Sequence, residues 1–303
     1  MLLDLSERAK FKVTGADRWR FLNGQLTNDI NVLRPGETLY ACALTAKGKL
    51  CADLYVTSAG EAFYLDTASV LQAPLLARLE RYIIADDVSI EDVTTDFSVF
   101  HFLNRNAEQF DLEGAAFTSL AKEPFPVFAS RSNRFASYGM DLWFPPAARA
   151  LILETWRENP STSETVENLR IERGIAVWGN ELSENVIPNE AGLQDRAISF
   201  TKGCYLGQEV ISRIKSVGHV NRHLRGLIPT KEILPQQGDK LVADPASMKE
   251  VGLITSVGKS TQSGATIALG FVRRGFDKSG TVLQLSRENI LIGSVEVNEL
   301  PLD

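Results

Sequence analysis

The hydrophobic pattern of this chain changes at about residue 225, and this change constrains the fold more than any other feature. Before that point, segments with helical spacing of apolar residues alternate with short strands. After it, short apolar segments are separated by Gly, Pro and Asp turns, without helical periodicity. Closely spaced short strands are typical of a small barrel or sandwich. The pattern predicts mixed α and β structure over residues 1–225 and a β domain over residues 226–303.

The spacing of apolar and turn residues also predicts individual elements. Helices are expected at 17–26, around 75–83, at 148–158 and at 164–173, with Pro74 in the first turn of the second helix and Ser163 as the N-cap of the fourth. In the first region, strands are expected at 38–45, 50–57, 62–66, 88–93 and 97–103. Residues 104–150 are expected to hold edge strands and loops, because prolines interrupt them. The second region should contain strands at 224–228, 251–257, 267–272, 282–285 and 290–297.

The net charge, the hydropathy and the cysteine content disfavour several classes of function. The net charge of the 303 residues is −6, which disfavours a large nucleic-acid footprint, so no direct nucleic-acid partner is expected. No apolar stretch approaches the roughly 18 residues that span a bilayer, and the N-terminus does not resemble a signal peptide. We therefore expect a cytoplasmic protein without membrane partners. The 3 cysteines form no C-x-x-C pair and cannot alone supply four thiolates for a cluster, so no resident metal site is expected.

The segment from Ile198 to Lys215 is the richest in chemical information. We expect a strand at 197–200 and a helix that begins between Tyr205 and Gln208, which would place Cys204 at the junction. Free N–H groups at a helix start favour a thiolate, and Lys202 would add a second positive charge. The alternative is a cysteine that serves only as a small buried apolar side chain. Residue-level reasoning leaves these two interpretations evenly balanced.

A resemblance to a known family covers nearly the whole chain. Residues 202–209, Lys-Gly-Cys-Tyr-Leu-Gly-Gln-Glu, resemble the K-G-C-Y-x-G-Q-E signature of the YgfZ family, folate-binding relatives of the glycine-cleavage aminomethyltransferase. Residues 21–30, Phe-Leu-Asn-Gly-Gln-Leu-Thr-Asn-Asp-Ile, resemble the F-L-x-G-Q-x-T-N-D-[IV] segment of that family. Residues 169–175 and 268–274 resemble its second internal motif and its C-terminal barrel motif.

The resemblance implies a fold, a ligand and a role. The fold would be the α+β, three-domain cloverleaf of the aminomethyltransferase type, with two interleaved α+β domains and a C-terminal β-barrel around a central folate-binding hole. The cofactor would be tetrahydrofolate or another reduced folate. The role would be to support the assembly or repair of iron–sulfur enzymes, including enzymes that modify tRNA. The expected partners are then iron–sulfur enzymes or their assembly proteins.

The resemblance also implies candidate site residues. Glu190 matches the glutamate with which aminomethyltransferases hold the pterin ring, and a carboxylate can accept two parallel hydrogen bonds from such an edge. Asp53 matches their catalytic aspartate, although Ala52 replaces a second acid that precedes it there. His219 stands near the position of a folate-contacting arginine, and it lacks the guanidinium fork.

Several alternatives remain open for these residues. Arg222 or Arg225 could instead meet the glutamate tail of the folate, and His219 could act as a base for Cys204. Asn28 and Asp29 are expected to line the folate cavity or to cap the preceding helix. Tyr205 and Gln208, within the signature, are further candidate ligand contacts.

Two functions compete at this point. The first is a folate-binding accessory factor in which Cys204, assisted by Lys202, is the reactive group. The second is an active aminomethyltransferase that relies on Asp53 and Glu190. The cysteine signature and the histidine at 219 favour the accessory factor.

Overall fold

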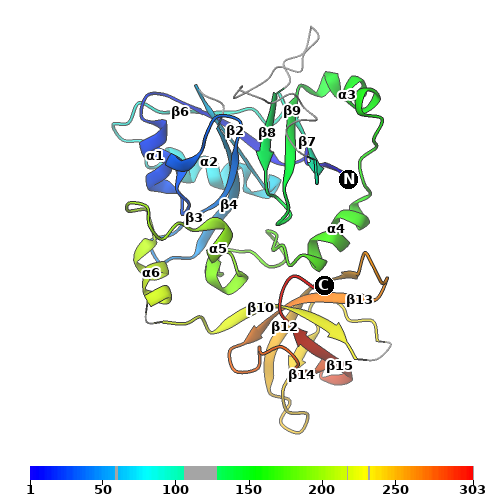
Figure 1. Cartoon of the computed structure of the whole chain (residues 1–303). Coiled ribbons are helices and arrows are strands. Elements are labelled where there is room, and N and C mark those ends of the chain that lie inside the picture. Colours follow the sequence, from blue (N-terminus) through cyan, green and yellow to red (C-terminus); the bar gives the residue numbers. More distant parts are fainter. Residues whose placement is uncertain (59–60, 106–127, 217, 231–232, 303) are drawn as a thin grey trace. The chain divides into compact units, whose positions relative to one another are not determined.

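The computed structural model describes residues 1–58, 61–105, 128–216, 218–230 and 233–302, which fall into two units (Figure 1). The first unit comprises Met1–Ser161 and Gln194–Val210, and the second comprises Thr162–Leu193 and Ile211–Asp303. The chain thus enters the second unit, returns to the first, and then passes again into the second within α6 (Gln208–Ser216). Within the described residues, every helix is too short or too polar to cross a bilayer.

The first unit contains two antiparallel sheets. The five-stranded sheet has the order β3-β4-β5-β2-β6 and the four-stranded sheet the order β1-β7-β9-β8. The strands of the first sheet are β2 (Ala9–Thr14), β3 (Thr38–Leu44), β4 (Leu50–Ser58), β5 (Phe63–Thr67) and β6 (Ser89–Asp92). Those of the second are β1 (Leu2–Asp4), β7 (Ser98–Leu103), β8 (Phe128–Ser132) and β9 (Gly139–Phe144).

Short helices complete the first unit. They are α1 (Arg18–Gln25), η1 (Ile30–Val32), η2 (Ser69–Leu71), α2 (Gln72–Glu80), η4 (Pro146–Ala148), α3 (Arg149–Trp156) and α5 (Gln194–Ala197). Pro74 lies in the first turn of α2, as predicted. The apolar core of the four-stranded sheet is built from β7 and β9 side chains such as Phe100, Phe102 and Phe144, against which Ile152 of α3 packs.

The second unit contains a closed barrel. Its strand order is β10-β13-β12-β11-β14-β15, and β15 pairs back with β10. The strands are β10 (Arg222–Pro229), β11 (Lys240–Val242), β12 (Glu250–Lys259), β13 (Thr266–Arg273), β14 (Val282–Arg287) and β15 (Ile290–Asn298). Leu227, Leu241, Val272, Leu285 and Val297, from five strands, contribute to the barrel core. Outside the barrel the unit holds α4 (Ser163–Glu172) and the 3-10 helix η5 (Pro188–Ala191).

The structure confirms the predicted elements with few exceptions. Three-residue β1 and β11 were missed because they are too short to show alternation. β9, which falls in the region expected to hold edge strands and loops, instead lies inside its sheet between β7 and β8. The N-cap of α4 is Thr162, which accepts a hydrogen bond from the Thr165 N–H, so the assignment to Ser163 was wrong by one residue. Within the predicted loop region, residues 106–127, including Pro124 and Pro126, lie outside the described residues. The boundary between residues 225 and 226 stays a prediction.

Candidate functional site

Lys202 joins the two sequence motifs of the first unit. Its side chain is buried, and Nζ donates hydrogen bonds to the carbonyl oxygens of Asn23 at 2.6 Å, Leu26 at 2.8 Å and Asn28 at 2.7 Å. These bonds use all three donors of a lysine ammonium group. Burial lowers the pKa of Lys202 to about 8, and the Asp29 carboxylate opposes part of this shift. The structure therefore gives Lys202 a structural role, and its predicted catalytic role stays a prediction.

The segment before Cys204 is held by the same loop. Thr27 Oγ1 donates to the Ala197 carbonyl at 2.6 Å, and the Ser199 N–H donates to the Thr27 carbonyl at 3.0 Å. α5 ends at Ala197, and residues 198–200 form an irregular segment that belongs to no sheet. The predicted strand at 197–200 was therefore wrong. The following helix begins at Gln208, within the predicted range.

Cys204 is exposed and lines a cavity of about 600 Å³ in the first unit. Side chains from α1 and nearby loops form the walls, including Trp19, Arg20, Asn23 and Tyr82. The charge of Arg20 is compensated by Asp86, whose Oδ1 lies 2.6 Å from Nη2. Cys204 is thus accessible to a reagent or a partner, which excludes the alternative of a buried apolar cysteine.

Asp53 lies on β4 in a different environment from Cys204. The side chain is 7% exposed, and the Tyr40 hydroxyl donates to Oδ2 at 3.0 Å. Among the described residues, Oδ1 has no hydrogen-bond donor although it is buried. Burial raises the pKa of Asp53 above its ordinary value, while the Arg8 charge and the Tyr40 hydrogen bond oppose the rise. A buried acceptor without a donor is costly, so this oxygen is suited to a ligand that donates a hydrogen bond.

A tilted pair of aromatic side chains and a buried charge network adjoin Asp53. The rings of Tyr40 and Tyr55 have centroids 4.7 Å apart, and the Arg134 guanidinium lies 4.1 Å from the Tyr55 ring centroid. Arg134 in turn bonds to Asp66 on β5 and Asp141 on β9, at 2.6 and 2.8 Å. The network therefore links both sheets of the first unit and fixes the aromatic pair against which Asp53 is placed.

The other residues of the first unit that were predicted to contact the folate form hydrogen bonds within the protein or are at least partly buried. Asn28 donates from Nδ2 to the carbonyls of Tyr40 and Arg196, at 2.9 and 3.2 Å. Asp29 accepts from the Asn31 N–H and caps η1, the following helix, so the predicted cap of the preceding helix was wrong. Tyr205 is buried, which raises its pKa to about 12, and Gln208 is partly buried at the start of α6.

Glu190 and Arg222 form an ion pair in the second unit. Nη2 of Arg222 lies 3.1 Å from Oε2 of Glu190, and the same oxygen accepts the Ile187 N–H at 3.3 Å. The Arg222 guanidinium stacks 4.4 Å from the centroid of the Phe271 ring. Among the described residues of this unit, Oε1 of Glu190 receives no hydrogen bond. One carboxylate oxygen is therefore held in place and the other is open to a donor.

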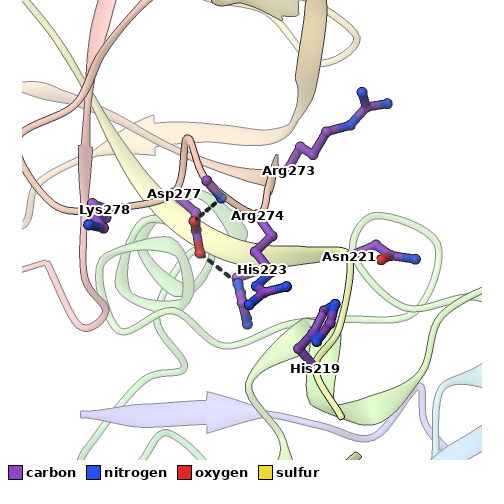
Figure 2. A pocket seen from close by; sticks show the side chains of 8 residues that line it. His219, Asn221, His223, Arg273, Arg274, Asp277 and Lys278 are labelled. Carbon is purple, nitrogen blue, oxygen red and sulfur yellow. Dashed lines mark hydrogen bonds and ion pairs between the residues drawn. The ribbon is translucent and has the colours of Figure 1, made fainter.

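His219 and Arg225, the alternatives to Arg222, have separate surroundings. His219 is exposed and lines a cavity of about 950 Å³ in the second unit, which contains further basic side chains (Figure 2). Arg225 donates from Nε to the Asp277 carbonyl at 2.8 Å and is held within the barrel unit.

The structure separates the predicted residues into three groups. Cys204 lines its own cavity in the first unit, Asp53 lies at a buried position of the same unit outside that cavity lining, and Glu190 with Arg222 belongs to the second unit. Sequence reasoning missed Tyr40, the donor to Asp53. The available signal was the hairpin itself, since Tyr40 pairs with Tyr55, two residues beyond the Cys42–Asp53 pair.

Comparisons with known proteins agree with this architecture. Residues 1–139 match the GCVT N-terminal domain, and residues 222–299 match the glycine cleavage T-protein C-terminal barrel domain. An aminomethyltransferase from Clostridium botulinum is 26% identical over 100% of this chain and 84% of that protein. The tRNA-modifying protein YgfZ of Escherichia coli O157:H7 is 29% identical over 79% of this chain and 75% of that protein.

The glycine cleavage system aminomethyltransferase T from Bartonella henselae has the same fold. It matches with a TM-score of 0.84 at 22% identity, over 100% of this chain and 86% of that chain. Together with the two domain matches, this confirms the predicted fold of two α+β domains and a C-terminal barrel of six strands.

Proposed function

We propose, from the premise that this chain belongs to the YgfZ family related to the aminomethyltransferases, that it binds a reduced folate and acts as an accessory protein for iron–sulfur enzymes. The observation that carries the folate proposal is the buried Oδ1 of Asp53, which has no donor among the described residues. A reduced pterin offers N–H donors to such an acceptor. The cofactor in this proposal is tetrahydrofolate, and the site of action is the cytoplasm.

Glu190 supports the proposal from the second unit. Its Oε2 is fixed by Arg222 and the Ile187 N–H, while Oε1 is free to accept from an amino-pyrimidinone edge. Asn28, Asp29, Tyr205 and Gln208 would then position the loops around the ligand rather than hydrogen bond to it, since the structure shows most of them engaged or buried.

Cys204 is the reactive group of the proposal. The exposed thiol lies on a cavity that Asp53 does not line, so the thiol and the folate carboxylate would work at separate places. This separation favours an accessory role, in which Cys204 reacts with a species from iron–sulfur assembly.

Calorimetric titration with monoglutamyl tetrahydrofolate tests the folate proposal. Asp53→Asn and Glu190→Gln should each weaken binding by about 10- to 100-fold, because each loses a charged acceptor. Glu80→Gln, which removes an exposed carboxylate at the end of α2, is the matched control and should bind like wild type. Equal affinity of all four proteins would refute the assignment of both carboxylates.

Complementation of a deletion strain tests the role of the thiol. Cys204→Ala should bind the folate normally but leave iron–sulfur enzyme activities low under oxidative stress, whereas Cys42→Ala should restore them. Normal activities with Cys204→Ala would contradict the proposal. Turnover in a methylene-transfer assay with an aminomethyl-lipoyl carrier would instead establish an aminomethyltransferase.

A further inference from the structure

The first unit contains a cavity of about 480 Å³ that takes no part in the proposed function. Neither Asp53 nor Cys204 lines it. Its walls come from β3, β8 and β9 and from the segments next to these strands. Binding sites for small molecules have volumes of roughly 300–1,000 Å³, so this cavity is large enough to enclose one ring compound.

The hydroxyl of Ser132 lies in this lining without a hydrogen bond. The side chain is only 6% exposed, and its Oγ has no partner among the described residues. Gly139, which pairs with Ser132 across the sheet, brings no side chain that could reach it. Ser130, two residues earlier on the same face of β8, is instead bonded to Thr38, with 2.9 Å between the two hydroxyl oxygens. A buried hydroxyl without a partner is costly, so Ser132 is suited to a polar group of a ligand.

Arg131 brings a positive charge to the same cavity. Its neighbour in the adjoining segment is Glu37, which forms an isolated parallel bridge with it. Oε2 of Glu37, however, accepts the Arg34 N–H at 3.0 Å, so that this carboxylate is held in its own turn. Arg105, a second cation of the lining, is paired with Glu158 at 2.6 Å. Across the described ranges, no acidic side chain pairs with the guanidinium of Arg131, which is exposed and able to hold an anion.

Apolar side chains complete the wall of the cavity. Leu33 and Met140 are buried, and the ring of Tyr138 is 63% exposed. A ring compound that covered Tyr138 would remove apolar surface from water, and a methionine sulfur makes favourable contacts with aromatic rings. A guanidinium group, in turn, binds a carboxylate through its planar fork. The lining therefore matches a molecule that combines an aromatic ring with one carboxylate.

We infer that this cavity binds a small aromatic carboxylate that carries a hydroxyl group on its ring. The carboxylate pairs with Arg131, the ring lies against Tyr138 and Met140, and the ring hydroxyl bonds to Ser132. Both hydroxyls can donate or accept, so this bond forms in either direction. An amine in place of the carboxylate would be repelled by Arg131, and a polyphosphate would need more than one unpaired cation.

Titration followed by ligand-observed nuclear magnetic resonance tests the contacts one at a time. The probes are para-hydroxyphenylacetate, which has all three groups, phenylacetate, which lacks the hydroxyl, and para-hydroxyphenylethanol, which lacks the carboxylate. Compared with para-hydroxyphenylacetate, wild type should bind para-hydroxyphenylethanol about tenfold and phenylacetate about threefold more weakly, because a charged hydrogen bond contributes more than a neutral one. Equal affinities, or no binding of para-hydroxyphenylacetate up to about 10 mM, would overturn the inference.

Two variants locate the polar contacts. Arg131→Gln should remove the preference for para-hydroxyphenylacetate over para-hydroxyphenylethanol, and Ser132→Ala should remove the preference over phenylacetate. Arg81→Gln, which removes an exposed charge of the same unit outside the cavity, is the matched control and should keep both preferences. If either Arg131→Gln or Ser132→Ala keeps the wild-type preferences, the assigned site is overturned.

Thermal melts provide a readout that does not depend on the probes. Ser132→Ala should melt no lower than wild type, because it removes a hydroxyl without a partner, whereas Ser130→Ala loses its bond to Thr38 and should melt lower. A lower melting temperature for Ser132→Ala than for wild type would show that this hydroxyl is already bonded within the protein, and would overturn the inference.

Competition separates this cavity from the proposed folate site. Saturating monoglutamyl tetrahydrofolate should leave the affinity for para-hydroxyphenylacetate unchanged, since Asp53 does not line the cavity. Displacement of the probe by the folate would assign the cavity to the folate site and overturn the inference. The titrations with the three probes contain no folate, so they test the cavity even if the proposed function fails.

Discussion

Gly207 is the residue of the signature with the strictest backbone requirement. Its φ is +86°, and a Cβ atom there would lie 2.5 Å from the Thr45 carbonyl oxygen. Gly207→Ala should therefore lower the free energy of unfolding by about 1–3 kcal/mol. Gly203→Ala is the matched control, because a Cβ atom at 203 meets nothing within 4 Å. Urea unfolding curves should separate the two variants, and coincident curves would contradict the structure.

Accessibility distinguishes Cys204 from Cys42. Cys204 is exposed, whereas Cys42 is fully buried, and burial raises the pKa of its thiol well above the ordinary value. Alkylation by iodoacetamide at neutral pH, followed by mass spectrometry, should modify Cys204 at least about tenfold faster than Cys42, which reacts only after local opening. Cys204→Ser should abolish the fast phase. Similar rates at both cysteines would show that Cys204 is not freely accessible.

Lys202 shows what could not be predicted at this scale. The motif indicates a lysine near a reactive thiol, and its position in the sequence is correct. Its three acceptors, however, come from the end of α1 and the loop that follows it, 174 to 179 residues earlier in the chain. Neither composition nor local spacing reports such a contact, so a buried structural lysine resembles a catalytic one in the sequence.

At the scale of elements, the hairpin of β3 and β4 determines which side chains surround Asp53. The pairing shifts by one residue between Ala43 and Leu44, so that Cys42 lies opposite Asp53 and Tyr40 opposite Tyr55. Both strands were predicted from the sequence. The bulge was not, because no residue type demands it there, and a one-residue shift changes which face each partner occupies. Asp53 was predicted from the family resemblance, and Tyr40 was missed although its pairing with Tyr55 in the hairpin carried a signal.

The charge network between the two sheets makes the free energy of unfolding depend on pH in the acidic range. Burial alone would raise the pKa of Asp141, but the Arg134 guanidinium and the His101 hydrogen bond lower it from 3.8 to about 2. As the pH falls, the unfolded chain binds this proton first. The contribution of Asp141, about 2 kcal/mol, is therefore complete above its ordinary pKa and is lost as the pH falls toward 2.

Asp141→Asn tests this dependence. Its unfolding free energy should lie below that of wild type at neutral pH, and the difference should shrink between about pH 5 and pH 2. Urea titrations at several pH values provide the measurement. Glu80→Gln is the control and should follow the wild-type curve throughout. A difference that stays constant with pH would show that Asp141 contributes by packing rather than by charge.

At the scale of the whole molecule, the residue patterns predicted the division into an α+β region and a barrel. They did not predict that the chain returns from the second unit to the first. Gln194–Val210, which carries the signature, belongs to the first unit although the residues on both sides belong to the second. Hydrophobic periodicity indicates only local helices and strands. Residues 194–210 belong to the first unit because Thr27 and Lys202 form hydrogen bonds between segments that are far apart in the sequence. The resemblance to a family supplied the interleaved arrangement that residue patterns could not.

The barrel depends on residues outside its strands. The hydroxyls of Thr255 and Ser256 on β12 donate to Oε1 of Glu181, at 2.8 and 2.6 Å, and Arg170 of α4 pairs with Glu181 at 3.0 Å. A fragment of residues 218–302 retains the apolar core but loses this cover. In hydrogen exchange, amides of β12 should exchange at least about tenfold faster than in the full chain, while β14 amides should keep their protection. Uniform loss of protection would show that the barrel does not fold alone.

The closed barrel and the open sheets differ in whether a strand of another molecule can pair with their edges. A closed barrel offers no border to which a foreign strand could add, whereas each sheet of the first unit has two. β1, β3 and β8 are each bridged by loop residues, and β6 is the border without such a bridge among the described residues. It is short and carries Glu91 and Asp92, whose negative charges repel an identical strand from a second molecule. The charges of Glu91 and Asp92 therefore disfavour edge-to-edge pairing of β6 with a second molecule, the step that would begin fibrillar association.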